Sequence, residues 1–124
     1  DFGGLFAILP IYGAILIFTS MASLGLPGLN GFISEFMIVR GVWPIYTLFI
    51  ALAMIGLLFT GVYVLKAIKF TLHGPLNEKW SGKLTEINLR ELFVIVPLMI
   101  LMLTIGLWPS WILDLINSTV MTWF

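Results

Sequence analysis

The chain has 124 residues, of which 60% are hydrophobic and only 10% are charged, and its net charge is zero. A soluble domain usually carries about 25% charged residues, so this composition indicates a membrane protein. The absence of cysteine excludes disulfides and thiol chemistry, the single histidine excludes a histidine-rich metal cluster, and no basic patch indicates binding to nucleic acid.

Apolar segments predict an all-α fold, a polytopic bundle of transmembrane helices within one membrane domain, residues 1–124. A helix needs about 20 apolar residues to cross a bilayer, and three segments are long enough. The run at 29–42 is shorter and contains Glu35, so by length alone it is either a re-entrant segment or an incomplete span. We expect helices at about 5–23, 28–42, 44–71 and 91–114, with a cytoplasmic loop at about 72–90.

Glycine and proline divide the first two segments. The sequence Gly25-Leu26-Pro27-Gly28 predicts a helix break, because proline removes a backbone donor and glycine permits turn conformations. Gly31 follows on the same helical face as Gly28. Pro97, one or two turns into the last segment, is expected to kink it.

The polar stretch at 66–91 sets the expected orientation. It holds five of the six basic residues, namely Lys66, Lys69, Lys79, Lys83 and Arg90. By the positive-inside rule it faces the cytoplasm or the mitochondrial matrix. The third segment then runs inward and the last runs outward. The first segment runs inward if 29–42 spans the membrane and outward if 29–42 is re-entrant.

Glu35 is the main candidate for a functional residue. Between Phe2 and Lys66, only Glu35 and Arg40 are charged. An ionised carboxylate in a span costs at least about 2.5 kcal/mol on insertion scales, and such residues mostly mark transport paths or water-filled cavities. The functional interpretation is a proton or ion relay. The alternative is that Glu35 is neutral, or pairs with a basic residue on a neighbouring helix for stability alone.

Other polar side chains are weaker candidates for a proton path. For the hydroxyl residues before the break, the alternative interpretation is that each bonds back to its own helix. For Lys66 the alternative is a flanking residue whose ammonium extends to the membrane interface, and for His73 it is a loop residue beside a turn. The full set is Thr19, Ser20, Ser23, Thr60, Tyr63, Lys66 and His73.

SMASLGLPGLNGFISEFMI, residues 20–38, resembles the twelfth-helix region of the antiporter-like subunits of respiratory complex I, the proton-pumping NADH-quinone oxidoreductase. The similarity extends along nearly the whole chain. The stretches DFGGL, HGPLN, INLRELF and GLWPSWILD, in this order and spacing, resemble the C-terminal end of the M-type subunits, equivalent to subunit 4 of the mitochondrial set.

This resemblance implies that the four segments correspond to helices eleven to fourteen of a fourteen-helix subunit, with the second of the four discontinuous. Glu35 maps onto the ionisable residue at the end of the family's central chain of proton-relay residues. Related L-type and N-type subunits and sodium/proton antiporters usually have lysine there, so glutamate favours the M type.

The implied function is proton translocation in the membrane arm, coupled to quinone reduction elsewhere in the complex. The chain would be part of an enzyme, an NADH:quinone oxidoreductase, but has no redox site of its own, and flavin and iron–sulfur clusters are expected in other subunits. The implied partners are neighbouring membrane-arm subunits, the N-terminal part of the same subunit and the lipid bilayer. The implied location is a prokaryotic plasma membrane or an organelle's energy-transducing membrane.

Two alternatives remain in the transport class. One is a subunit of a multisubunit sodium/proton antiporter. The other is a related subunit of a membrane-bound hydrogenase or of the ferredoxin-plastoquinone complex. A third interpretation, a structural or assembly membrane protein, treats the glycine break as packing and Glu35 as one half of a stabilising pair.

Overall fold

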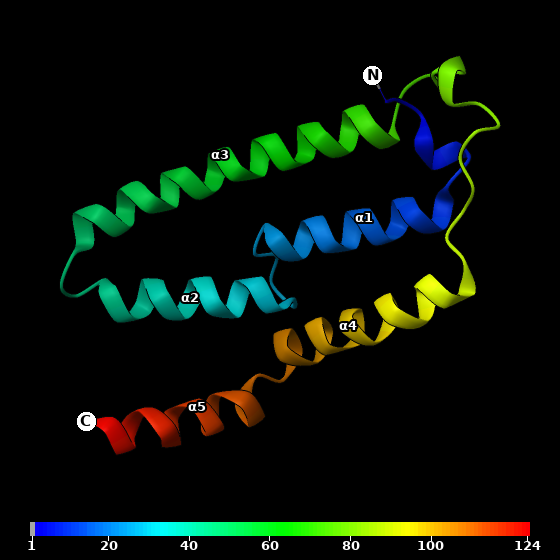
Figure 1. Ribbon diagram of the computed structural model, residues 1–124. Helices are drawn as coiled ribbons and strands as arrows, with labels where there is room; N and C mark the ends of the chain where they lie inside the picture. The colour runs from blue at the N-terminus through cyan, green and yellow to red at the C-terminus, as the bar shows by residue number, and fades with distance from the viewer. Residues whose placement is uncertain (1) are drawn as a thin grey trace.

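The computed structural model describes residues 2–124, and within this range it is helical with no strand. Asp1, with which the DFGGL stretch begins, lies outside the described residues. The all-α prediction is confirmed. Five α-helices follow one another, with short 3-10 turns at Leu5–Ala7 and Glu78–Trp80: α1 (Pro10–Ser23), α2 (Asn30–Val42), α3 (Thr47–Leu72), α4 (Leu89–Leu107) and α5 (Ser110–Trp123) (Figure 1).

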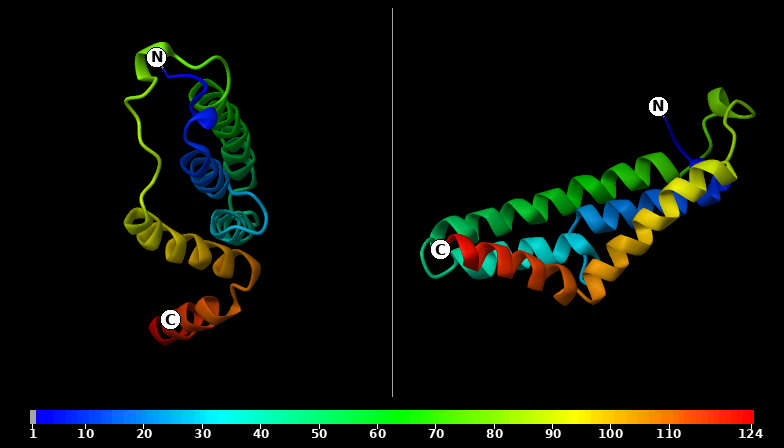
Figure 2. Two further views of the ribbon diagram at one scale, coloured as in Figure 1. Left: turned by 90° about the vertical axis from the view of Figure 1, so that its right-hand side faces the viewer. Right: turned by 60° about the horizontal axis from the view of Figure 1, so that its bottom comes forward.

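The helices α1 and α2 lie end to end along one side of α3 (Figures 1 and 2). The start of the chain meets the end of α3, where the Gly4 N–H donates to the His73 carbonyl over 3.1 Å. Leu24, just after α1, reaches the middle of α3, where its Cδ1 lies 3.4 Å from the position of a Cβ on Gly61. At 1.5 Å per residue, α3 is about 39 Å long and α1 and α2 are about 21 and 20 Å. The two short helices together therefore match the length of α3.

This arrangement differs from the expected succession of separate segments. The chain turns at 24–29 without reversing, so α2 continues in the direction of α1, and only α3 returns (Figure 1). The turn is ordered by short-range hydrogen bonds, such as the one from the Leu26 N–H to the Met21 carbonyl, 3.2 Å. Both short helices pack against α3.

The last segment also differs from the expectation of one helix at about 91–114. The helix α4 ends at Leu107 and α5 begins at Ser110. Pro109 explains the interruption, since proline has no N–H and disfavours helical geometry in the residue before it. Trp108 accordingly has φ −136° and ψ 74°. Pro97, in contrast, lies inside α4, which continues through it.

The first helix begins later than expected, at Pro10 rather than near Leu5. Gly4 has a left-handed φ of 65°, and residues 5–7 form only a 3-10 turn. Proline is favoured in the first helical turn because its missing N–H would be unsatisfied there in any case. The first segment is thus a short helix of 14 residues preceded by a turn.

Little of the apolar surface is buried within the chain. The buried cluster consists of Leu5, Ile68 and Leu72, where the start of the chain and α1 pack against the end of α3. Large side chains elsewhere on α3 are exposed, for example Leu58 at 72%. By length and composition, α3 and α4 could each cross a membrane. Exposed apolar surface on this scale indicates contact with lipid or with other membrane helices.

Candidate functional site

The break between α1 and α2 requires glycine at two positions. Gly25 has φ 76° and Gly28 has φ 98°, both in the left-handed region that side chains disfavour. The Leu24 N–H donates to the Ser20 carbonyl over 3.0 Å, and the Gly25 N–H donates to the Ala22 carbonyl over 3.2 Å. The break is therefore an ordered turn with its backbone groups partly satisfied.

Glu35, in the second turn of α2, folds back over this turn. A Cβ on Gly25 would overlap the Glu35 carboxylate, whose Cδ lies 2.8 Å from the Cβ position. The carboxylate therefore occupies the space that a side chain at position 25 would need. The Glu35 side chain is half-buried, and within residues 2–124 its carboxylate has neither a hydrogen bond nor an ion pair. An ion pair inside the described chain thus does not account for this residue.

Two further glycines bring helices close to the break. A Cβ on Gly31 would overlap the Ala22 carbonyl oxygen, so Gly31 allows the start of α2 to pack against the end of α1. A Cβ on Gly106 would overlap the Gly28 carbonyl, so Gly106 allows α4 to cross the break. Sequence reasoning had singled out Gly31 but missed Gly106. The only available signal was a small residue near the end of an apolar helix, where close helix contacts are common.

Among the predicted hydroxyl residues of α1, Thr19 bonds within its own helix. The Thr19 hydroxyl donates back to the carbonyls of Ile15 and Leu16 over 2.9 and 3.2 Å. Ser20 is half-buried and Ser23 is exposed at the end of the helix. Thr19 thus makes the local bond that had been the alternative interpretation.

The predicted residues of α3 are spread along that helix. The Thr60 hydroxyl donates to the Gly56 carbonyl over 3.2 Å, and Tyr63 is 63% exposed. The Lys66 ammonium lies 5.9 Å from the centre of the Phe70 ring, a cation–π distance. His73 follows the helix as its C-cap and stacks on Phe6, with ring centres 6.5 Å apart. It is 12 residues, or about 18 Å, along α3 from Gly61, which faces the break.

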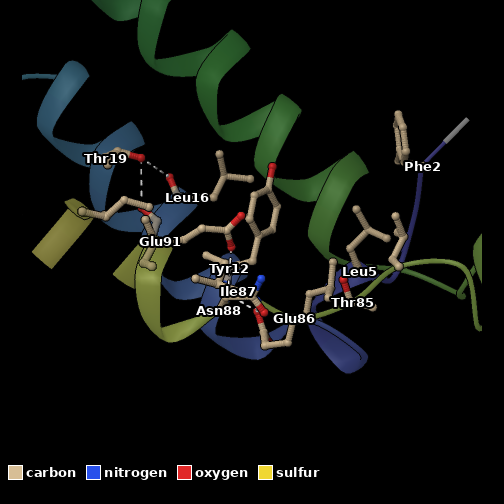
Figure 3. A pocket seen from close by; sticks show the side chains of 14 residues that line it. Phe2, Leu5, Tyr12, Leu16, Thr19, Thr85, Glu86, Ile87, Asn88 and Glu91 are labelled. Atoms are coloured by element: carbon tan, nitrogen blue, oxygen red, sulfur yellow. Dashed lines mark hydrogen bonds between the residues drawn. The ribbon is translucent and has the colours of Figure 1, made fainter. Parts of the chain in front are cut away.

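A second polar region, which sequence reasoning missed, lies at the start of α1. The Glu86 carboxylate accepts hydrogen bonds from the backbone N–H groups of Ile11 and Tyr12, each over 3.1 Å, and of Ile87 over 2.9 Å. It lies at a cleft of about 650 Å³ between the start of α1, the loop at 84–88 and the start of α4 (Figure 3). Desolvation acts to raise the pKa of Glu86, but the three N–H donors outweigh it and hold the pKa below its ordinary value. No sequence pattern links an acid to a helix that begins more than seventy residues earlier.

The start of α4 is capped by residues at its own N-terminal end. Asn88 and Glu91 form a capping box, in which the Asn88 N–H donates to the Glu91 carboxylate over 3.0 Å. Residues 2–124 hold no group of three acidic, histidine or cysteine side chains that could bind a metal ion.

Comparisons with known proteins agree with this membrane architecture. Residues 1–60 match the family described as NADH:quinone oxidoreductase/Mrp antiporter, transmembrane. The first 60 residues of the chain are thus similar to this family of membrane subunits.

Its similarity to individual members extends along almost the whole chain. It is 34% identical over 120 residues to NADH-quinone oxidoreductase subunit M of Mycobacterium tuberculosis, covering 97% of this chain and 22% of that protein. It is 31% identical over 119 residues to subunit M of Rhodobacter capsulatus, covering 96% of this chain and 23% of that protein. It is 29% identical over 119 residues to NADH-ubiquinone oxidoreductase chain 4 of Arabidopsis thaliana, covering 96% of this chain and 24% of that protein. The chain thus spans less than a quarter of the length of these relatives.

Proposed function

We propose that the chain is part of a proton-translocating membrane-arm subunit of an NADH-quinone oxidoreductase, and that Glu35 is a proton relay within it. One observation carries the proposal: the Glu35 carboxylate lies on the glycine turn of a helix break, with no partner of its own in residues 2–124. The names of the relatives supply the class of complex. Electron donors, flavin and iron–sulfur clusters would belong to other subunits.

The arrangement of α1 and α2 supports one broken span in place of two. Each is about 20 Å long, short of the 30 Å hydrocarbon core, whereas both together match α3. We infer three spans: α1 with α2, then α3, then α4, which is long enough by itself. In the terms of the resemblance these are the twelfth, thirteenth and fourteenth helices, and the discontinuous one contains both α1 and α2. The eleventh helix would then precede this chain.

The same arrangement gives an orientation. The loop at 73–88 lies beside the start of α1, since Gly4 bonds to His73. Because basic residues are concentrated around this loop, we assign it to the cytoplasmic or matrix side. The α1–α2 span then runs outward, and Glu35 lies in its outer half. A proton released from Glu35 would have the shorter part of the membrane left to cross.

The break gives Glu35 a setting in which protonation can change. Non-helical backbone at membrane depth is tolerated where it is buried in protein or lines a water-filled cavity. The glycine at 25 leaves backbone, rather than a side chain, beside the carboxylate. Water or a basic group from the remainder of the subunit can therefore approach it, and a nearby cation would favour the ionised form. Moving that cation away would favour proton uptake.

The test is Glu35→Gln in the full-length subunit within its complex, with Asp114→Asn as the matched control on the exposed face of α5. Proton uptake per electron transferred is measured in sealed membrane vesicles. We expect Glu35→Gln to assemble but to lower this ratio, and Asp114→Asn to leave it unchanged. A full ratio with Glu35→Gln would refute the relay.

A second candidate function follows from the family description, which also names Mrp antiporters. In that case the subunit would exchange sodium for protons without electron transfer. Purification of the full-length protein with its partners distinguishes the two. Flavin and iron–sulfur subunits with NADH-to-quinone activity support the first function, whereas sodium-driven proton movement with no redox subunits supports the second.

A further inference from the structure

The start of α1 is held by a side chain from a distant part of the sequence. Pro10 has no N–H, so Ile11 and Tyr12 offer the first free backbone donors of the helix, and the preceding residue, Leu9, provides no side-chain cap. The Glu86 carboxylate accepts a bond from each, with both distances 3.1 Å. Its negative charge also suits the positive end of the helix dipole.

Glu86 links α1 to the segment before α4, and the end of α4 contacts the turn that follows α1. It lies three residues before Leu89, where α4 begins, and the start of α4 is already capped by Asn88 and Glu91. In that turn, the Gly28 carbonyl packs on Gly106 near the end of α4. The cleft of about 650 Å³ separates the two helices near their starts (Figure 3). Glu86 therefore supplies, across the cleft, the bonds that tie α1 to the segment leading into α4.

We propose that Glu86 is a positioning residue for the helix break: by holding the first turn of α1, it sets the place of the glycine turn on which Glu35 rests. The helix between them is a continuous rod of 14 residues, so a shift at its start is carried to its end. There, Ala22 packs on Gly31 and Gly25 packs on the Glu35 carboxylate. The significance of this position for proton transfer rests on the function proposed above, but the positioning itself does not.

The lowered pKa of Glu86 agrees with this role, since the three N–H donors favour the ionised carboxylate. Tyr12 and Glu91 are the other titratable groups that line the cleft, and Glu91 is bonded within its own helix start.

The experiment compares Glu86→Ala and Glu86→Gln with Glu78→Ala, a nearby exposed acid on the same loop. Each variant is made in the full-length protein and purified with its partner subunits. Hydrogen–deuterium exchange is followed by mass spectrometry in peptides covering residues 9–16 and 22–30. We expect roughly fivefold faster exchange at the start of α1 in Glu86→Ala, because an uncapped helix end opens more readily. The peptide at 22–30 should also exchange faster, and Glu78→Ala should change neither.

Glu86→Gln keeps an acceptor oxygen and should recover part of the protection, and it replaces Glu86→Ala if the alanine variant does not assemble. If exchange became faster at 9–16 but stayed unchanged at 22–30, the inference would be overturned, because Glu86 would then be a local cap only. Unchanged exchange at both would overturn it as well.

Proton uptake per electron is recorded on the same preparations. A general loss of structure would lower the rate of electron transfer as well, so this ratio separates a positioning effect from misfolding. We expect a lower ratio in Glu86→Ala, with the rate of electron transfer kept and partial recovery in Glu86→Gln. A displaced break in Glu86→Ala together with a full ratio in Glu35→Gln would refute the proposed relay and leave the positioning role of Glu86 standing.

Discussion

The Glu35 carboxylate and the Cα of Gly25 are in such close contact that a methyl group on the glycine could not be accommodated. Gly25 lies in the turn between α1 and α2, Glu35 lies on α2, and the two are ten positions apart. Their contact makes the acid and the break one structural unit, and the first prediction follows from it.

Gly25→Ala should displace the Glu35 side chain and lower proton uptake per electron. Two effects act together, since alanine at φ 76° is strained by about 1–2 kcal/mol and its Cβ overlaps the carboxylate. The variant Gly82→Ala separates the backbone strain from the overlap with the carboxylate. Gly82 has φ 74° but open space around its Cβ position. It should show the strain without the loss of pumping, and equal losses in both variants would argue against the role of the contact.

Gly106→Ala should push α4 away from the break. Its Cβ would meet the Gly28 carbonyl, which is backbone and cannot rotate aside. Overpacking of this kind typically costs about 1–3 kcal/mol. Thermal denaturation of the purified full-length protein measures the effect. Gly56→Ala on α3 is the control, because nothing lies within 4 Å of its Cβ position, and it should be neutral or slightly stabilising.

The cap formed by Glu86 should weaken in acid. Its pKa in the folded protein lies below the ordinary value of 4.5, so its contribution is fully present above pH 4.5 and is lost as the pH falls through the lower, folded value. The difference in melting temperature between the native protein and Glu86→Gln should therefore be constant from pH 8 to 5 and shrink below that range. A difference that persists unchanged in strong acid would show that the charge of Glu86 is not what stabilises the helix start.

Single-cysteine labelling distinguishes three spans from four. Phe2→Cys, Ser81→Cys and Ile45→Cys are made in full-length protein with its other cysteines replaced, and a membrane-impermeant maleimide is applied from one side. With α1 and α2 as one span, positions 2 and 81 react from the cytoplasmic or matrix side and position 45 from the other. If α1 and α2 each crossed the membrane, position 2 would react from the same side as position 45.

The sequence predicted the features that depend on local chemistry. Composition and apolar runs indicated membrane helices, and Gly25, Pro27 and Gly28 located the break. Whether the chain reverses at that break could not be predicted, since a glycine–proline turn is compatible with either direction. The direction depends on α3, which packs beside both short helices.

The contacts of Glu86 and Gly106 could not be predicted for a different reason. Each joins residues more than seventy positions apart, and neither belongs to a spaced motif. Glu86 looked like any charged residue of a polar loop, and Gly106 like a small residue in an apolar helix. Their roles depend on where α4 crosses α1 and α2, which is a property of tertiary packing.

Gly61 has a mechanical consequence for the α1–α2 joint. A break in a helix is a hinge unless something bridges it, and the glycine turn alone would let the two halves bend. The uninterrupted α3 extends past both sides of the joint, and at Gly61 it lets Leu24 approach the helix backbone. The α3 helix thereby stiffens the joint and holds Glu35 in a fixed place beside it, as the proposed relay would require.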